Sequence, residues 1–227
     1  MCGACLAKPQ PLAAEYFCVA CRTPFLNAAP LDEEGRCEVC RRGLGGFNAA
    51  YSFGAYQDTL RELIHLFKYT RIRTLAGPLG EMMASALPRE QSFDAVVPVP
   101  LHWRRRLERG FNQSELLARA VAPRYGLRVT DAARRRRPTT AQAGLSNARR
   151  RANVAGAFTV KRAHAIAGRR VLLVDDVMTT GATAAACAAA LRQAGASYVA
   201  LLTLARVDRR IGAEPYAAES LAVGVSR

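Results

Sequence analysis

Along most of this chain, short runs of branched apolar residues alternate with segments in which apolar residues recur every three or four positions. The short runs are typical of strands buried on both faces of a parallel sheet, and the longer period indicates amphipathic helices. We expect strands over 49–56, 93–99, 127–131, 171–174 and 198–205, and helices over 59–69, 75–87, 114–124 and 184–194. This order predicts an α/β fold, a parallel sheet flanked by helices.

The most informative stretch joins the strand over 171–174 to the Ala-rich helix that follows. Asp175 and Asp176 come directly after the strand, and the next residues are Val177, Met178, Thr179, Thr180, Gly181, Ala182 and Thr183. We expect 175–183 to form a short turn at the carboxyl end of the strand, where open α/β sheets bind ligands. Hydroxyls, a glycine and a helix N-terminus favour a phosphate, and paired carboxylates favour a ligand that carries hydroxyls or Mg²⁺. A phosphorylated sugar has both features.

Two other interpretations of this stretch account for less of it. A phosphoacceptor receiver domain also begins with VLLVDD, but it needs a further Asp and a Lys on later strands, and the chain after Asp176 offers no such pair. A purely structural turn, in which one Asp caps the helix, leaves the second acid and the three threonines around Gly181 unexplained.

The cysteines predict a metal-binding module at the N-terminus. Six of the seven lie within the first 45 residues as three CxxC pairs, with spacings typical of zinc knuckles. The closed four-thiolate set is Cys18, Cys21, Cys37 and Cys40. Pairing of Cys2 and Cys5 with Cys18 and Cys21 stays open, and buried thiols without a metal or a redox pair are the other interpretations. We expect a cysteine-rich zinc module over 1–46 and a second domain over 47–227.

The net charge of +15 fits two kinds of partner, a nucleic acid or a polyanionic small molecule. Arginines concentrate between the strand over 93–99 and the helix over 114–124, at Arg104, Arg105, Arg106 and Arg109, before Gly110. We expect an extended basic loop that forms a second anion site, with a solvated arginine face as the alternative. The segment 134–154 is polar and aperiodic, which predicts a lid, or a disordered basic tract that binds DNA.

Nothing in the sequence indicates a membrane protein. The first residues carry no basic start followed by an apolar run, and no apolar stretch approaches the length of a membrane span. We therefore expect a cytoplasmic protein without membrane insertion.

Taken together, the motifs resemble one family over nearly the whole chain. The CxxC cluster precedes LIHLFKY (63–69), VVPVPL (96–101), RRRLERGFNQSELLARA (104–120), RPTTAQAGLSNARRRANVAGAF (137–158) and VLLVDDVMTTGAT (171–183). This combination resembles the ComF family, competence-associated proteins with a type I phosphoribosyltransferase fold and an N-terminal zinc module, implicated in DNA uptake and natural transformation. Longer members carry four CxxC pairs where this chain has three.

The resemblance implies a role for each candidate residue. Asp175 and Asp176 would hold the ribose hydroxyls of phosphoribosyl pyrophosphate (PRPP), directly or through Mg²⁺, and residues 177–183 would hold its 5′-phosphate. The pyrophosphate would meet the four arginines of 104–109, and Arg149 and Arg151 would belong to a flexible lid. The implied reaction is Mg²⁺-dependent phosphoribosyl transfer to an unidentified acceptor. The alternative is a non-catalytic adaptor that senses PRPP or binds single-stranded DNA, with a competence helicase or other DNA-uptake proteins as partners.

Overall fold

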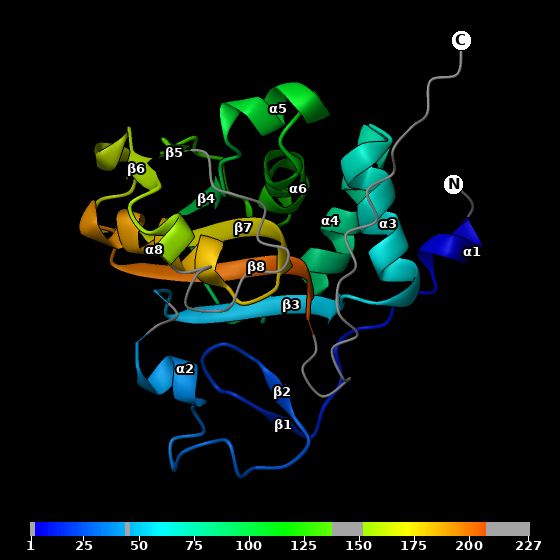
Figure 1. Cartoon of the computed structure of the whole chain (residues 1–227), viewed down its shortest axis with the longest axis vertical. Coiled ribbons are helices and arrows are strands. Elements are labelled where there is room, and N and C mark those ends of the chain that lie inside the picture. The colour runs from blue at the N-terminus through cyan, green and yellow to red at the C-terminus, as the bar shows by residue number, and fades with distance from the viewer. Residues whose placement is uncertain (1–2, 44–45, 138–151, 208–227) are drawn as a thin grey trace.

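The computed structural model describes residues 3–43, 46–137 and 152–207. Its centre is a four-stranded sheet in the order β3-β8-β7-β4, in which every neighbouring pair is parallel (Figure 1). The strands are β3 (Ala49–Ala55), β4 (Ala95–Pro98), β7 (Arg170–Met178) and β8 (Tyr198–Arg206). The predicted α/β class is confirmed.

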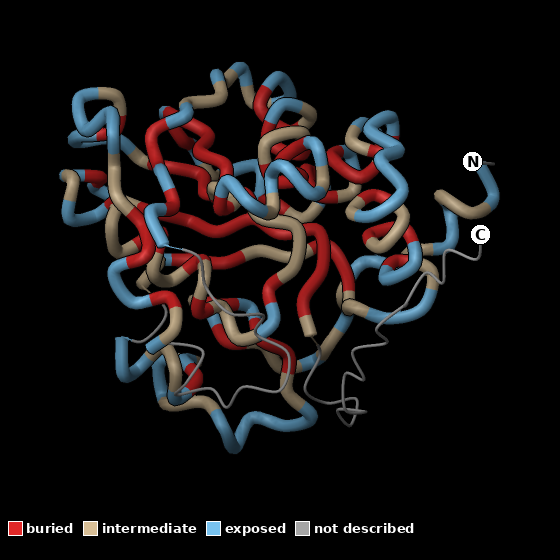
Figure 2. The backbone as a smooth tube through the Cα atoms, turned by 45° about the horizontal axis from the view of Figure 1, so that its top comes forward, coloured by how far each residue is buried: buried red, intermediate tan, exposed pale blue. Residues whose placement is uncertain are grey.

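Helices cover both faces of this sheet. One face packs against α3 (Asp58–Tyr69), α4 (Ala76–Ser85) and α6 (Gln113–Val121), and the other against α8 (Ala182–Gln193). Strand β7 is continuously apolar over 171–174 because both of its faces are buried there. Leu172 and Val174 pack toward α3, α4 and α6, whereas Val171 and Leu173 pack toward α8. Figure 2 shows the strands as the buried centre of the molecule.

Smaller elements complete the described chain. An antiparallel ribbon of β5 (Ala133–Arg135) and β6 (Phe158–Val160) lies beside α8. Three 3₁₀ turns are η1 (Arg73–Leu75), η2 (Ala122–Tyr125) and η3 (Ala163–Ala165). No described helix has the length and apolar character needed to cross a membrane.

The cysteine-rich segment packs beside the outer strand β3, at the bottom of Figure 1. It contains only short elements, namely α1 (Gly3–Leu6), β1 (Tyr16–Phe17), β2 (Pro24–Phe25) and α2 (Glu38–Arg41). The Ala50 amide donates to the Ala20 carbonyl at 2.9 Å, and the Leu12 amide donates to the Phe53 carbonyl at 2.6 Å. The segment therefore occupies part of an edge that would otherwise present unpaired backbone groups.

Three sequence predictions need correction. Strand β7 does not end at Val174 but continues to Met178, because Asp175 and Val177 pair in register with β8. The predicted strand over 127–131 is reduced to a single bridge between Val129 and Val96. Helix α6 ends at Val121, and the chain continues as the tighter turn η2.

Candidate functional site

The two acidic side chains at the end of β7 are held by different partners. Ser114 Oγ, in the first turn of α6, donates to Asp175 Oδ1 at 2.9 Å, as does the Asp176 amide. Lys68 Nζ, in the last turn of α3, lies 3.1 Å from Asp176 Oδ1, and both side chains of that pair are 15% exposed. The acid pair therefore lies where α3, α6 and β7 meet.

The two acids have different electrostatic surroundings. Burial and the neighbouring charge of Asp176 raise the pKa of Asp175 to about 7, against the hydrogen bonds from Ser114 and the Asp176 amide. Burial by itself lowers the pKa of Lys68, but the charge and hydrogen bond of Asp176 raise that pKa above its usual value. Lys68 is thus a resident cation beside Asp176, whereas Asp175 titrates near neutrality.

The loop after β7 has a conformation suited to binding a phosphate. Gly181 adopts φ +77°, in the left-handed region, and α8 begins at the next residue. Thr179 is exposed, Thr180 and Thr183 are partly exposed, and Thr180 Oγ1 accepts from the Ala182 amide at 3.4 Å. Hydroxyls and helix N-terminal amides thus meet in one turn.

The other three members of the predicted phosphate loop are placed differently. Met178 and Ala182 are buried, and Val177 packs against the core as a partly buried residue. Their side chains are apolar, so only their main chain offers hydrogen bonds to a ligand.

The arginine-rich segment is a helix, not the extended loop that we expected. Helix α5 (Trp103–Arg109) begins because His102 Nδ1 accepts from the Arg104 amide at 3.4 Å, and it ends at Gly110, whose φ is +77°. The helix divides the four arginines: Arg104 and Arg106 are exposed, whereas Arg105 and Arg109 are partly buried. Two of the four therefore face the body of the protein.

Arg109 lies near Lys68, the partner of Asp176. Its Nη1 donates to Gln113 Oε1 at 3.1 Å, and its guanidinium lies 5.3 Å from the centre of the Tyr69 ring. The charge of Arg109 also acts on Lys68. Gln113 is 1% exposed, and its Nε2 has no hydrogen-bond partner among the described residues. An orphaned buried donor beside an arginine is a candidate contact for an anionic ligand.

Arg135 is a further charged residue of this region. It lies on β5, is 8% exposed, and its guanidinium is 5.4 Å from the centre of the Phe158 ring. Burial and the charge of Arg105 lower its pKa, and the charge of Asp175 opposes them. The first two residues of the predicted lid over 134–154 therefore belong to β5, with Arg134 exposed and Arg135 buried, and Arg149 and Arg151 lie outside the described residues.

The four cysteines of the predicted metal site come together. Their Sγ atoms all lie within 4.8 Å of one another, and Cys18 Sγ accepts from the amides of Cys21 at 3.5 Å and Cys37 at 3.3 Å. A tetrahedral zinc with Zn–S of about 2.3 Å would place the thiolates roughly 3.8 Å apart, so this donor set fits zinc. Cys5 is not part of the cluster, and Cys2 lies outside the described residues.

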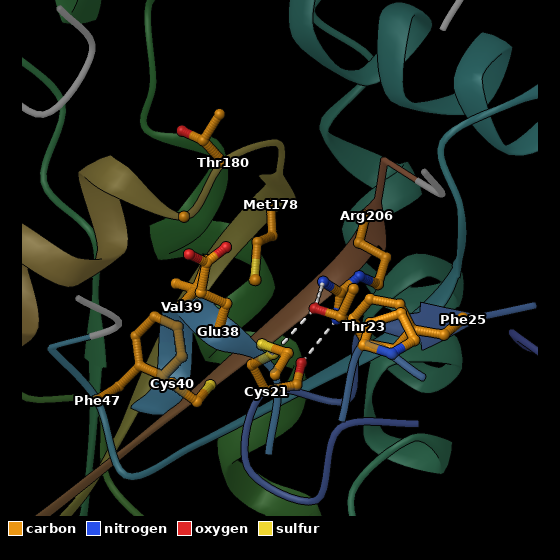
Figure 3. Close-up of a pocket in the computed structure, with 13 residues that line it drawn as sticks. Cys21, Thr23, Phe25, Glu38, Val39, Cys40, Phe47, Met178, Thr180 and Arg206 are labelled. Carbon is orange, nitrogen blue, oxygen red and sulfur yellow. Dashed lines mark hydrogen bonds between the residues drawn. The ribbon is translucent and has the colours of Figure 1, made fainter. Parts of the chain in front are cut away.

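The cysteine cluster lies next to the predicted phosphate loop. A pocket of about 160 Å³ is lined on one side by Cys21, Cys37 and Cys40 and on the other by Met178, Thr180 and Gly181 (Figure 3). Arg206, at the end of β8, spans the two parts: its guanidinium is buried and donates to the Cys21 carbonyl and to Thr23 Oγ1, both at 2.6 Å.

Sequence reasoning missed Lys68, Ser114 and Arg206, and it placed Arg135 in a lid or basic tract without expecting it to be buried. Lys68 stands at the end of an apolar helix pattern, and Arg206 ends an apolar strand. A single charge at the end of an apolar element is a usable signal, because such a charge is buried only when it has partners. Ser114 carries no comparable signal.

Comparison with known proteins identifies the family. Residues 109–220 match the family described as phosphoribosyl transferase domain. DNA utilization protein YhgH of Escherichia coli O6:H1 is 35% identical over 158 residues, which cover 66% of this chain and 69% of YhgH. Competence protein F of Haemophilus influenzae is 32% identical over 178 residues, 75% of this chain and 78% of the relative. The chain belongs to the ComF family.

As a ComF-family protein, it has the type I phosphoribosyltransferase fold, preceded by a cysteine cluster that fits a zinc module. Among solved structures, one titled as the allosteric regulatory enzyme of purine biosynthesis is 24% identical with a TM-score of 0.41. The match covers 58% of this chain and 25% of that enzyme.

Proposed function

We propose that this ComF-family protein binds PRPP at the carboxyl end of β7 and transfers the phosphoribosyl group to an acceptor, releasing pyrophosphate. The observation that supports this most is the sequence of groups along one strand end. Two acids with separate partners, Lys68 and Ser114, are followed by the left-handed Gly181 and the N-terminus of α8. Carboxylates suit sugar hydroxyls, and the turn suits a terminal phosphate.

In this proposal each part of the site has one task. Asp175 and Asp176 accept hydrogen bonds from the ribose hydroxyls, and Thr179, Thr180 and Thr183 bind the 5′-phosphate with the main chain of the same turn. Arg109 and the Gln113 amide lie on the side toward α5, where the pyrophosphate would lie. Arg104 and Arg106, which are exposed, would contribute only long-range attraction.

The reaction itself needs little covalent help from the protein. The bond between C1 of the ribose and the pyrophosphate oxygen breaks, the pyrophosphate keeps the electron pair, and the acceptor forms the new bond to C1 and loses its proton. Mg²⁺ held by the oxygens of PRPP would neutralise the leaving group. The chain's own contribution is to position the sugar and to stabilise charge with arginine and amide donors.

We also propose that zinc, bound by Cys18, Cys21, Cys37 and Cys40, has a structural role. The support is the donor set: four thiols in one closed cluster, with backbone amides donating to Cys18 Sγ. A closed set of four protein ligands leaves no open position for catalysis at the metal.

Isothermal titration with PRPP and Mg²⁺, run beside a pyrophosphate-release assay over candidate amines and bases, tests the proposal. We expect saturable binding by the wild type and its loss in the double variant Asp175→Asn, Asp176→Asn. Asp131→Asn, which removes an exposed carboxylate from a surface pair with Lys161, is the matched control and should bind normally. Unchanged affinity in a folded double variant would refute the assignment. Binding without pyrophosphate release would indicate a PRPP-sensing adaptor instead.

A second candidate function, binding of single-stranded DNA, is favoured by a different surface. On α5, Trp103 is 58% exposed and Leu107 is 72% exposed, four residues apart on one side of the helix. The Arg104 guanidinium lies 5.3 Å from the centre of the Trp103 ring. An exposed aromatic ring beside an arginine is a suitable platform for stacking a base. The names of the relatives, DNA utilization protein and competence protein, agree with such a partner.

Fluorescence anisotropy with a labelled oligonucleotide at several salt concentrations tests this second function. We expect Trp103→Ala to weaken binding about tenfold, because stacking on an aromatic side chain contributes about 1–3 kcal/mol per base. Arg162→Ala removes an exposed positive charge elsewhere and is the control. If both variants weaken binding equally, the contact is general electrostatic attraction and α5 is not the platform. Arg135 is buried, so a variant at Arg135 would not test how surface charge contributes to DNA binding.

A further inference from the structure

Of the chain's three lysines, Lys68 alone has a side chain that is largely shielded from solvent and paired with a carboxylate. Lys8 and Lys161 are exposed, and the side chains of the Lys161–Asp131 pair are 42% and 65% exposed. The side chains of Lys68 and Asp176, by contrast, are each 15% exposed, with Nζ and Oδ1 3.1 Å apart.

The position of this pair is hard to explain by stability alone. A buried ion pair loses the hydration of both charges, and apolar residues of the same size would often stabilise the fold as well or better. Along β7, Asp176 continues the side that carries Leu172 and Val174, which face the layer containing α3. An apolar residue at Asp176 would therefore continue the core pattern, and the charged pair needs another reason.

The pair fixes one end of the sugar site. In the part of the chain that the structure describes, Asp176 is paired with the ammonium of Lys68, whereas Asp175 accepts from the hydroxyl of Ser114. A carboxylate has lone pairs for more than one donor, so the ion pair orients Asp176 and still leaves it able to accept from a ligand. The titratable and charged groups around Lys68 include Arg109 from α5, Asp175 and Asp176 from β7, His65 from α3 itself, and Tyr56.

We propose that Lys68 determines the sugar specificity of this site, by holding Asp176 in place as the acceptor for a ribose hydroxyl so that ribose phosphates bind in preference to 2-deoxyribose phosphates. The inference rests on the proposed function, because it requires the sugar to lie against Asp175 and Asp176. A site built to accept a hydrogen bond rejects the ligand that lacks the hydroxyl, since a buried acceptor is then left without its partner. Without Lys68, Asp176 loses its fixed orientation and the preference falls.

Isothermal titration of ribose 5-phosphate and 2-deoxyribose 5-phosphate against four proteins tests this. We expect the wild type and Lys161→Met to prefer ribose 5-phosphate by about tenfold, the order of one hydrogen bond to a charged group. Lys68→Met should reduce the preference to about twofold or less, and Lys68→Arg should keep most of it. Affinity for inorganic phosphate, which needs only the loop at 179–183, should change little, so a general loss of folding would be recognised. Lys68→Gln replaces Lys68→Met if the methionine variant does not fold.

The outcomes separate the inference from the proposed function. Equal preference in the wild type and Lys68→Met would overturn the role of Lys68 while leaving the sugar site in place. A wild type that binds neither sugar phosphate, or both equally, would contradict the placement of the ribose at Asp175 and Asp176, and the inference would fail with it.

Discussion

Arg206 offers a direct test of how the cysteine cluster is attached to the sheet. Its guanidinium is 3% exposed and makes two hydrogen bonds of 2.6 Å, one to the Cys21 carbonyl and one to Thr23 Oγ1. Thr23 Oγ1 also lies 2.9 Å from Cys21 Sγ. Replacing Arg206 with Met would remove both bonds and leave two buried oxygens without these donors.

The size of the effect follows from these contacts. Hydrogen bonds from charged groups contribute about 1.5–3 kcal/mol each, so Arg206→Met should cost about 3–6 kcal/mol. Thr23→Val removes one of the two bonds and should cost about 1.5–3 kcal/mol. Because the two residues share a bond, their effects should add to more than the effect of the double variant. The loss should appear first as undocking of the cysteine module, because the sheet keeps its own core.

Chemical denaturation together with the rate of zinc release to a chelator measures both consequences. Zinc should leave Arg206→Met faster than Thr23→Val, and Thr23→Val faster than the wild type. Arg119→Met, which breaks an exposed pair with Glu115, is the control and should change the free energy of unfolding by less than about 1 kcal/mol. Wild-type stability and zinc release in Arg206→Met would refute the reasoning.

Three further predictions follow from single residues. Cys18→Ser should release zinc, measured by metal analysis, and a metal-free variant with wild-type thermal stability would contradict a structural metal. Gly46→Ala should lower the melting temperature, because a Cβ at Gly46 would lie 2.5 Å from the Ala185 carbonyl oxygen and the φ of Gly46 is +66°. Gly43 has a similar φ but open space around it, so Gly43→Ala should lower the melting temperature less. The pKa of Asp175 is raised in the fold, so its contribution is fully present below about pH 4 and is lost as pH rises to about 7, by at most about 4 kcal/mol. Asp175→Asn should flatten the stability between about pH 4 and 7 in denaturant titrations, and an unchanged slope would show that Asp175 is not the group responsible.

The regular elements were predictable because their signals are local. A local apolar pattern indicates which face of an element is buried. The structure buries the apolar run over 171–174 and the helically spaced residues Leu60, Leu63, Ile64 and Phe67. The order of the sheet was not readable, because β8 is the last of the described strands in sequence yet lies between β3 and β7. The position of β8 depends on how the strands and helices pack against one another in space, and the periodicity of apolar residues carries no information about that packing.

The site was predictable where chemistry clusters in sequence and not where it is assembled in space. Asp175, Asp176 and the turn that follows them are neighbours in the chain, whereas Lys68 and Ser114 come from other elements. The end of β7 was misplaced because acids normally interrupt a buried strand, and here pairing with β8 continues past them. Helix α5 was predicted as an extended loop because of the prolines that precede it. The capping residues His102 and Gly110, which favour a helix between them, are the signal that this prediction left out.

The most direct test of the central claim is a crystal structure of this protein with PRPP and Mg²⁺. We expect the 5′-phosphate in the turn at 179–183 and the ribose hydroxyls within hydrogen-bond distance of Asp175 and Asp176, with the pyrophosphate toward Arg109. A PRPP molecule bound elsewhere, for example along the exposed face of α5, or no bound PRPP in crystals that admit other small anions, would contradict it.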